Sequence, residues 1–481
     1  MNLIKLIIAL PFCFDTLAQG VESSKVFPVD KLKEDYKIFR DAITDAHPAA
    51  FRYISREGLN LFYDSISTSI NSPMTDEAFT RLLLLSVAKI RCAHTIALFP
   101  VTSWFSNPDI KKRTILPLNF KFIDNQAFVS RSFSKVTSAK IIGQRVISIN
   151  NVPIETYIDQ FLPLLNSDGY ISSSRNEQLS IKFKDYFSYF IARPDTFSLE
   201  LEQPFSHDYQ LLKIPAIAIS ELLEGLSLKD YLPFRFKLET NEVAYLRMDD
   251  FLISNLKKAY QISYKKYLRR SFMEMEKKKI KYLIIDVRNN GGGNGEVGAS
   301  LFSHIAYKSF IHERSTVIKY KKFNQHYVKY AKKGDRLDGY WGIQTDTGFT
   351  LTHFYSKLKR RWKPKINSFK GTVTVLSGGN TYSAGSAFVG LFKAEGRGAI
   401  IGDETGGYAF GPTGYLRLEL ELPNTKTRVI IPLVIARLNI DAYTFGQGVT
   451  PIFKISDEER IHSLLEGYDP ELKKALELFE K

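Results

Sequence analysis

One serine in the sequence stands where a side-chain hydroxyl could act as a nucleophile. Residues 372–376 form a β-branched apolar run that predicts a buried strand. A turn signal, Ser-Gly-Gly-Asn, follows at 377–380, and Ser383 then opens a segment of small residues that predicts a packed helix. This arrangement can lift a serine hydroxyl above a sheet edge and leave the next backbone N–H, that of Ala384, free to bind an oxyanion. A serine that merely caps the helix is the alternative.

A second loop of the same kind comes earlier in the chain. Residues 282–285 predict a buried strand, and Asp286 to Asn290 lead from it into three glycines at 291–293. A glycine run after a buried strand lets backbone N–H groups approach a ligand without interference from a Cβ. Two such loops at one end of a sheet indicate an acyl-transfer site. We interpret Asp286 and Arg288 as a support for the loop, not as an acid and a base.

The two loops together resemble peptidase family S41, the C-terminal processing peptidases and their tricorn-core relatives. The resemblance is carried by LIIDVRNNGGG at 283–293, TYSAGSAF at 381–388 and GRGAIIGDETGG at 396–407. Gly291 stands where the family has a proline. The resemblance is strong from Val243 to Pro451 and weak before Thr95.

The resemblance implies a serine-type peptidase that hydrolyses peptide bonds through an acyl-enzyme on Ser383. It also implies that the backbone N–H groups of Gly292 and Ala384 bind the oxyanion. The expected partner is a peptide or protein substrate, and the chemistry needs no metal and no cofactor.

The base is expected to be a histidine. Many S41 members use a lysine in this role, but Tyr408 stands at the corresponding position, which is aligned by Gly402 and Gly407. The tricorn-like branch instead uses a histidine before its PDZ-like module, and His94 lies at that place. A neutral imidazole is a suitable base for a serine hydroxyl. A structural histidine at a helix–strand junction is the alternative for His94, and we expect His47, before a proline, to pack or cap.

The acid that should orient the histidine is not evident. Where the tricorn-like branch has a glutamate, the nearest equivalent is Phe445, and Asp441 is the closest acid. Ile452 replaces the acid of the family's closing motif. A second hypothesis is therefore a non-catalytic protein that binds peptides or apolar ligands on the same scaffold. An esterase of the same chemistry is a third.

Strand–helix alternation in the rest of the chain predicts a mixed α/β fold, with a helical and a β-rich region before the α/β core. The resemblance implies that this catalytic core is of the S41 (ClpP/crotonase-like) type. Residues 143–154 resemble a hairpin of PDZ-like modules, and an ordinary β-hairpin is the alternative. The predicted regions are a signal peptide at 1–18, a helical N-terminal region at 19–100, a β-rich PDZ-like module at 101–235, the catalytic domain at 236–456 and a helical tail at 457–481.

Several elements are predicted with definite bounds. Apolar spacing predicts a helix at 29–47, and Thr75 followed by two acids predicts the start of another. Asp124-Asn125 indicates a hairpin turn. The other predicted elements are an amphipathic helix at about 254–279, an insertion over the site at 310–370, a hairpin of 416–422 with 429–436, and a helix at 470–480.

The N-terminus predicts export to the periplasm or the cell exterior. A short apolar run at 6–14 precedes a cleavage signal near Ala18, and the run is too short to span a bilayer. After cleavage only Cys92 remains, so no intramolecular disulfide can form. The formal net charge of +15 suits a solvated cationic surface that faces anionic envelope polymers or lipid. No nucleic-acid-binding motif is present, and the oligomeric state is not predicted.

Overall fold

The computed structural model describes ten stretches of the chain, which are residues 25–98, 113–134, 139–225, 232–319, 325–334, 342–345, 348–352, 356–408, 410–441 and 443–479. Within them, no helix combines the length and the apolar character that crossing a membrane requires. The signal-peptide prediction falls on residues outside these stretches.

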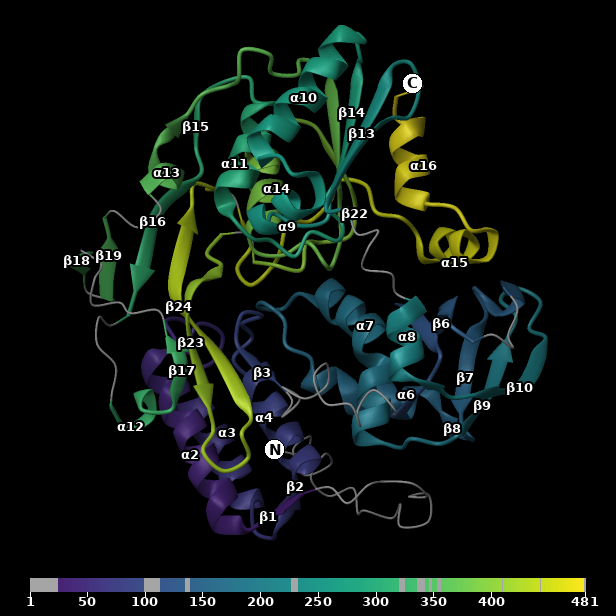
Figure 1. Cartoon of the computed structure of the whole chain (residues 1–481), viewed down its shortest axis with the longest axis vertical. Helices are drawn as coiled ribbons and strands as arrows, with labels where there is room; N and C mark the ends of the chain where they lie inside the picture. Colours follow the sequence, from purple (N-terminus) through teal and green to yellow (C-terminus); the bar gives the residue numbers. More distant parts are fainter. Residues whose placement is uncertain are drawn as a thin grey trace.

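A five-stranded sheet forms the centre of the catalytic region (Figure 1). All neighbouring strands are parallel except the first pair. Nearly every residue of the three central strands is buried, as expected for parallel strands covered on both faces. In order across the sheet, the strands are β12 (Phe234–Leu238), β13 (Val243–Met248), β14 (Tyr282–Asp286), β21 (Thr372–Ser377) and β22 (Ala399–Gly402).

Helices cover both faces of this sheet. Ile285 of β14 packs in a large core with the helices of one face, whereas its neighbour Ile284 packs in a smaller core on the opposite face. Strands β14 and β21 are parallel neighbours, so the two loops that follow them leave the same edge of the sheet. The helices of the first face are α9 (Ile253–Tyr260), α10 (Tyr264–Lys277), α11 (Gly295–Ser303) and α14 (Ala384–Ala394), and α16 (Pro470–Glu477) lies on the other.

A second, seven-stranded sheet lies beside the first. Its strands are β17 (Ala331–Gly334), β23 (Thr413–Glu421), β24 (Arg428–Leu438), β16 (Glu313–Ile318), β19 (Gly348–Leu351) and β18 (Gly342–Thr345), with β3 (Ile96–Leu98) paired to β24. The hairpin predicted for 416–422 and 429–436 is confirmed, and Figure 1 shows it reaching toward the N-terminal helices. Much of the predicted insertion at 310–370 instead supplies strands to this sheet.

Three helices build the N-terminal region, namely α2 (Val29–Ala46), α3 (Arg56–Ser69) and α4 (Asp76–Ala88). The predicted cap of α4 is confirmed, because the Thr75 side chain accepts a hydrogen bond from the Ala78 N–H. The short pair β1 (Val26–Phe27) and β2 (Met74–Thr75) joins the start of this region to the segment between α3 and α4. Because β3 pairs with β24, the segment that follows α4 is fixed to the catalytic region.

The middle region contains a six-stranded sheet. Its strands are β5 (Leu118–Ile123), β6 (Gln126–Ser132), β7 (Arg145–Ile149), β8 (Val152–Pro153), β9 (Thr196–Glu202) and β10 (Tyr209–Pro215). Asp124 and Asn125 have φ angles of 46° and 58°, which confirms the predicted hairpin turn. The sequence did not predict the helices, which are α6 (Ile154–Phe161), α7 (Ser172–Phe190) and α8 (Ile219–Gly225). The PDZ-like identity and the domain boundaries stay predictions.

One helix prediction needs correction, whereas the helix predicted at 470–480 is confirmed as α16. The single helix expected at 254–279 is two helices, because Gln261 has a φ of 57° and the Ser263 side chain caps a new helix. The tail also holds a helix before α16, namely α15 (Asp457–Glu466). The remaining short elements are β4 (Thr114–Ile115), β11 (Ile217–Ala218), β15 (Phe310–Ile311), α12 (Gln325–Val328), α13 (Ser356–Lys359) and β20 (Arg361–Trp362).

Candidate active site

Ser383 occupies a strained turn between β21 and α14. Its φ of 50° and ψ of −121° lie in a region that residues with a Cβ rarely adopt, at a cost of ~1–3 kcal/mol. Ser383 stands at the N-cap position of α14, but its side chain makes no capping hydrogen bond to the helix. The side-chain capping alternative is therefore wrong, and the hydroxyl stays available for chemistry.

Hydrogen bonds fasten this turn to the glycine loop that follows β14. The Tyr382 N–H donates to the Asn290 carbonyl oxygen at 2.8 Å, and the Thr381 hydroxyl donates to the Val287 carbonyl oxygen at 2.8 Å. The two loops therefore meet at one edge of the sheet, as the sequence predicted. Since the bonds involve mainly the backbone, they depend on the path of the chain more than on side-chain identity.

Gly292 lies directly against the nucleophile turn. Its φ is 97°, and a Cβ built on it would lie 2.6 Å from the Ser383 Cβ and 3.1 Å from the Ala384 nitrogen. Only glycine fits a backbone that approaches another so closely. This close approach orders the glycine loop around the serine.

The two predicted oxyanion donors differ in availability. The Ala384 N–H has no hydrogen-bond partner among the residues that the structure describes. The Gly292 N–H already donates to the Asn290 side-chain oxygen at 2.9 Å. One predicted donor is therefore open, whereas the other would have to leave or share its present partner.

His94 lies in the turn between α4 and β3, and its ring packs against Gly414 of β23. Burial lowers the pKa of His94, and the negative charge of Asp168 opposes that shift. The imidazole is consequently neutral near pH 7, as a general base for a serine hydroxyl must be. The Nδ1 atom of His94 is buried without a hydrogen-bond partner among the described residues. Among the same residues, no hydrogen bond joins the His94 ring to Ser383.

His47 has the structural role that the sequence predicted. Its Nδ1 accepts a hydrogen bond from the Ala49 N–H at 3.0 Å, so the proton sits on Nε2, which donates to the Thr95 hydroxyl at 2.8 Å. Burial and the charge of Arg52 lower the pKa of His47 to about 3. This neutral histidine positions Thr95, the residue that follows His94.

Asp168 is the residue at the site that sequence reasoning missed. Its buried carboxylate accepts a hydrogen bond from the Ala93 N–H at 2.7 Å and another from the Tyr408 N–H at 3.1 Å. Ala93 directly precedes His94, so Asp168 holds the backbone next to the predicted base. In the sequence, Ser-Asp-Gly reads as an ordinary turn, and no local signal distinguishes it.

Tyr408 connects Asp168 to the serine. The residue before it, Gly407, lies so close to the nucleophile turn that a Cβ built there would be 2.9 Å from the Ser383 nitrogen. The position where many S41 members carry a lysine thus contributes a backbone N–H to Asp168.

Residues 166–178, which we call the bracket, tie the two halves of the site together. The Asn166 side-chain amide donates to the Thr95 carbonyl oxygen at 2.8 Å, beside His94. The Gln178 side-chain amide donates to the Tyr382 hydroxyl at 3.1 Å, beside the nucleophile. The bracket includes the start of α7, which Figure 1 shows on the side of the middle region that faces the catalytic sheet.

The acids considered from the sequence do not orient His94. The Asp441 carboxylate is exposed and pairs with Arg314. Phe445 offers no acid. Asp168 is therefore the carboxylate whose charge acts on the His94 ring, although it bonds to the neighbouring backbone instead of Nδ1.

Comparison with protein families decides the class of this site. Residues 242–451 match the model of peptidase family S41. The chain carries an S41 peptidase domain. The S41 domain contains β13, β14, β21 and β22, together with both loops of the site. The class of enzyme is accordingly a serine-type peptidase.

Solved structures show a similar fold. Mature CPAF complexed with lactacystin has a TM-score of 0.64 and is 10% identical, over 93% of this chain and 98% of that one. Mature CPAF alone has a TM-score of 0.63 at 10% identity, over 92% and 95% of the two chains. No curated protein sequence matched.

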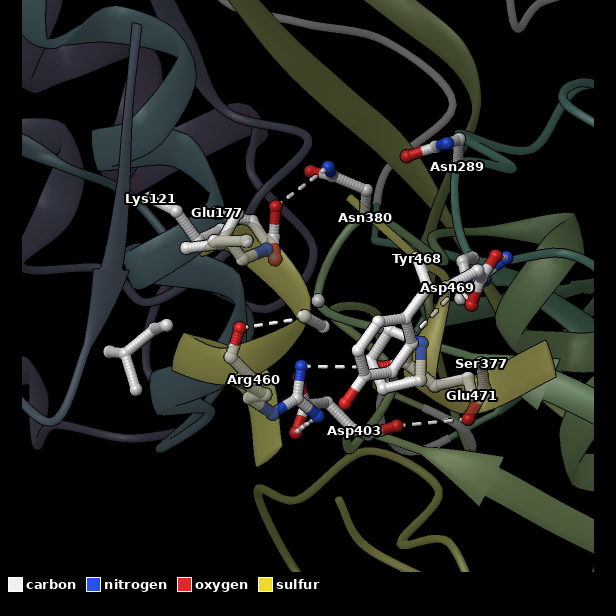
Figure 2. A pocket seen from close by; sticks show the side chains of 17 residues that line it. Lys121, Glu177, Asn289, Ser377, Asn380, Asp403, Arg460, Tyr468, Asp469 and Glu471 are labelled. Atoms are coloured by element: carbon white, nitrogen blue, oxygen red, sulfur yellow. Dashed lines mark hydrogen bonds and ion pairs between the residues drawn. The ribbon is translucent and has the colours of Figure 1, made fainter. Parts of the chain in front are cut away.

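A polar cavity of about 370 Å³ lies behind the nucleophile turn of the S41 domain (Figure 2). It is lined by the turn at 377–380, by residues of α15 and α16, and by Lys121 and Glu177 of the middle region. Ser383 and His94 are not among its lining residues. The cavity therefore lies among the residues that support the turn at 377–380, and not at the candidate active site.

Arg288 carries that support. Its guanidinium donates to Asp286 at 2.8 Å, to Asp469 at 2.6 Å and to Glu471 at 3.0 Å. Burial would raise the pKa of Asp286, but the charge of Arg288 and the hydroxyl of Tyr245 hold that pKa below its ordinary value. These contacts agree with the interpretation of Asp286 and Arg288 as a structural pair, which here also anchors the tail.

In the described ranges, no group of three or more His, Cys, Asp or Glu side chains could hold a metal ion.

We expect Gly292→Ala to slow labelling of Ser383 by a fluorophosphonate probe by ~10²-fold or more, because a displacement of about 1 Å has that effect on catalytic geometry. The added Cβ would overlap the Ser383 Cβ. The matched control is Gly291→Ala, since a Cβ at Gly291 meets no atom within 4 Å. Equal labelling rates in two folded variants, checked by circular dichroism, would contradict the close approach described above.

We expect Asp168→Asn to shift the acid limb of the pH–labelling profile toward lower pH. The Asp168 charge raises the pKa of His94, so removing it lowers that pKa further and keeps the base neutral to a lower pH. The measurement is the rate of fluorophosphonate labelling as a function of pH.

Asp35→Asn is the matched control for this prediction. Asp35 is also buried, and it accepts hydrogen bonds from the Asn424 N–H at 3.0 Å and the Thr425 N–H at 2.8 Å. Both variants should lose ~1–3 kcal/mol of unfolding free energy, but only Asp168→Asn should move the acid limb. An unmoved limb in Asp168→Asn would refute the action of Asp168 on a catalytic His94.

Proposed function

We propose that this S41 peptidase hydrolyses peptide bonds through an acyl-enzyme on Ser383. The observation that carries the proposal is the serine itself, which is held in a strained turn with its hydroxyl unused by the helix it precedes. Backbone strain that the surroundings maintain is typical of functional positions. The open Ala384 N–H beside it supports a role in binding the oxyanion.

In the proposed first step, the Ser383 oxygen attacks the carbonyl carbon of the scissile bond and its proton passes to His94. The Ala384 N–H binds the negative oxygen that forms. The C–N bond then breaks, and the leaving amine takes the proton from His94, which leaves an ester on Ser383. Water next attacks that ester with His94 again as the base, which releases the acid product and restores the serine.

Asp168 has a positioning role in this proposal. It holds the backbone on each side of the site through Ala93 and Tyr408. Hydrogen bonds of catalytic residues are often long without substrate and shorten in the complex. The missing bond between His94 and Ser383 is therefore compatible with catalysis.

A second candidate is a non-catalytic protein that binds peptides on the same scaffold. It is favoured by the unpartnered Nδ1 of His94 and by the bond that engages the Gly292 N–H. A triad without an acid on Nδ1 is weakened.

Fluorophosphonate labelling followed by mass mapping separates the two candidates. We expect the probe on Ser383 in the wild type, no labelling in Ser383→Ala, and a loss of ~10²-fold or more in His94→Ala, because a general base contributes that much. His462→Ala, at a half-buried histidine of α15, is the control and should label normally. Labelling retained in His94→Ala would assign the base elsewhere. A folded wild type that does not label would favour the binding protein.

We also propose that the chain is exported after cleavage near Ala18. Support comes from the short apolar run at 6–14 and from the positive net charge of +15, which suits association with an anionic envelope. N-terminal peptide mapping of the protein from its native cells should find a start near Gln19 in the exported fraction. A chain that keeps Met1 and stays in the cytosol would contradict export.

A further inference from the structure

Six aromatic rings form a connected group, which we call the aromatic cluster, and one of them, Tyr408, follows the glycine that lies against the nucleophile turn. Ring centroids lie 5.6 Å apart for Tyr53 and Tyr170, 5.2 Å for Tyr53 and Phe445, and 6.4 Å for Tyr53 and Tyr408. Tyr443 joins the group through Tyr408, with centroids 6.3 Å apart, and Phe410 stacks on Tyr443 with centroids 3.7 Å apart. The members are Tyr53, Tyr170, Tyr408, Phe410, Tyr443 and Phe445.

The cluster is continuous with the nucleophile. Tyr408 follows Gly407, whose backbone lies against the Ser383 nitrogen. At the other side, Gly446 has a φ of 74°, and a Cβ built there would lie 2.5 Å from the Tyr170 ring. The backbone thus fixes the Tyr170 ring beside Gly446 and connects Tyr408, through Gly407, to the nucleophile turn.

Part of this cluster faces solvent. Tyr170 is 51% exposed, Tyr443 is 45% exposed and Phe445 is 53% exposed, whereas Tyr408 is buried. Adjacent exposed rings form an apolar surface whose hydration is unfavourable, and such surfaces often mark binding sites. A large apolar side chain is the natural occupant of such a surface.

Arginines give the same surface a positive charge. The Arg91 guanidinium lies 4.4 Å from the centre of the Tyr170 ring, and Arg52 lies 5.5 Å from that of Tyr408. Arg52 donates to the Gly411 carbonyl oxygen, and neither guanidinium forms an ion pair within the described residues. The neighbouring Asp168 is already bound to two backbone N–H groups.

A third arginine adds to this excess of charge. Burial and the nearby charge of Arg91 lower the pKa of Arg175 on α7. Arg91 and Arg175 therefore act on each other as like charges, while the Asp168 carboxylate is engaged by two backbone N–H groups. A peptide that brings a carboxylate would relieve this repulsion.

We propose that the aromatic cluster binds a bulky apolar side chain of the substrate and that Arg91 binds a carboxylate of the same peptide. The substrate class is thus an acidic peptide with an aromatic or large aliphatic residue near the scissile bond. This inference rests on the proposed function, because it places the surface beside a catalytic Ser383. It assigns to Phe445 a role in selecting the substrate.

The test measures peptide binding to Ser383→Ala, which removes turnover and leaves the surface intact. The probe is a fluorescein-labelled hexapeptide with one phenylalanine and one glutamate among alanines, followed by fluorescence anisotropy. We expect replacement of its phenylalanine by glycine to weaken binding by ~tenfold or more, as for loss of an apolar group from a matching pocket. Replacement of its glutamate by glutamine should weaken binding at low salt only.

Second-site variants assign these effects to residues. Phe445→Ala should abolish the preference for phenylalanine, and Arg91→Gln should abolish the preference for glutamate. The matched control for the ring is Phe205→Ala, since Phe205 of the middle region is also 53% exposed. The control for the charge is Arg269→Gln, at an exposed position of α10. Both controls should bind like the parent.

The outcomes separate this inference from the proposed function. Binding that does not depend on the phenylalanine, or that Phe445→Ala leaves unchanged, would overturn the inference even if the wild type labels on Ser383. Preference for the acidic aromatic peptide in a wild type that does not label would overturn the catalytic proposal alone.

Discussion

The close approach of two backbones at Ser383 is the constraint on which the site depends. Gly292 lies where a Cβ would touch the Ser383 side chain, and Gly407 lies where a Cβ would touch the Ser383 nitrogen. The serine can keep its unusual backbone conformation because these neighbours lie against it and because Tyr382 and Thr381, just before it, donate hydrogen bonds to the carbonyl oxygens of Asn290 and Val287. Strain of this kind persists only where the structure around it is rigid. The buried parallel sheet supplies that rigidity.

The second half of the site is held by a different part of the chain. His94 belongs to the N-terminal region, and the bracket at 166–178 belongs to the middle region, yet both contact the S41 domain around the serine. The buried carboxylate of Asp168 unites the three, because each of its oxygens binds a backbone N–H from a different region. The middle region therefore helps to build the candidate site, whatever its relation to PDZ modules.

The structure changes the interpretation of Phe445. As a replacement for an expected glutamate, it counts against catalysis. In the structure, it packs with Tyr53 in a partly exposed aromatic cluster that reaches the nucleophile turn through Tyr408 and Gly407, and such a surface suits an apolar ligand. The same residue that weakens the case for a conventional triad thus strengthens the case for a substrate surface. The charge of the nearby arginines adds a preference that apolar contacts alone would not give.

The sequence by itself determined the local features of this protein. Strand β14 with its glycines, strand β21 with Ser383, the Thr75 cap and the Asp124 turn are each encoded within a few residues, since strand burial, helix capping and turn geometry are short-range effects. Parallel pairing of β14 with β21 then brings the two loops together. Only the tertiary structure decided the role of Asp168, whose partners lie 75 and 240 positions away along the chain. It also decided that Asn290 engages the Gly292 N–H. The role of Asp168 and the bond between Asn290 and Gly292 both depend on backbone N–H groups. Because every residue except proline carries this group, the residue types in a sequence do not show which N–H will be bound.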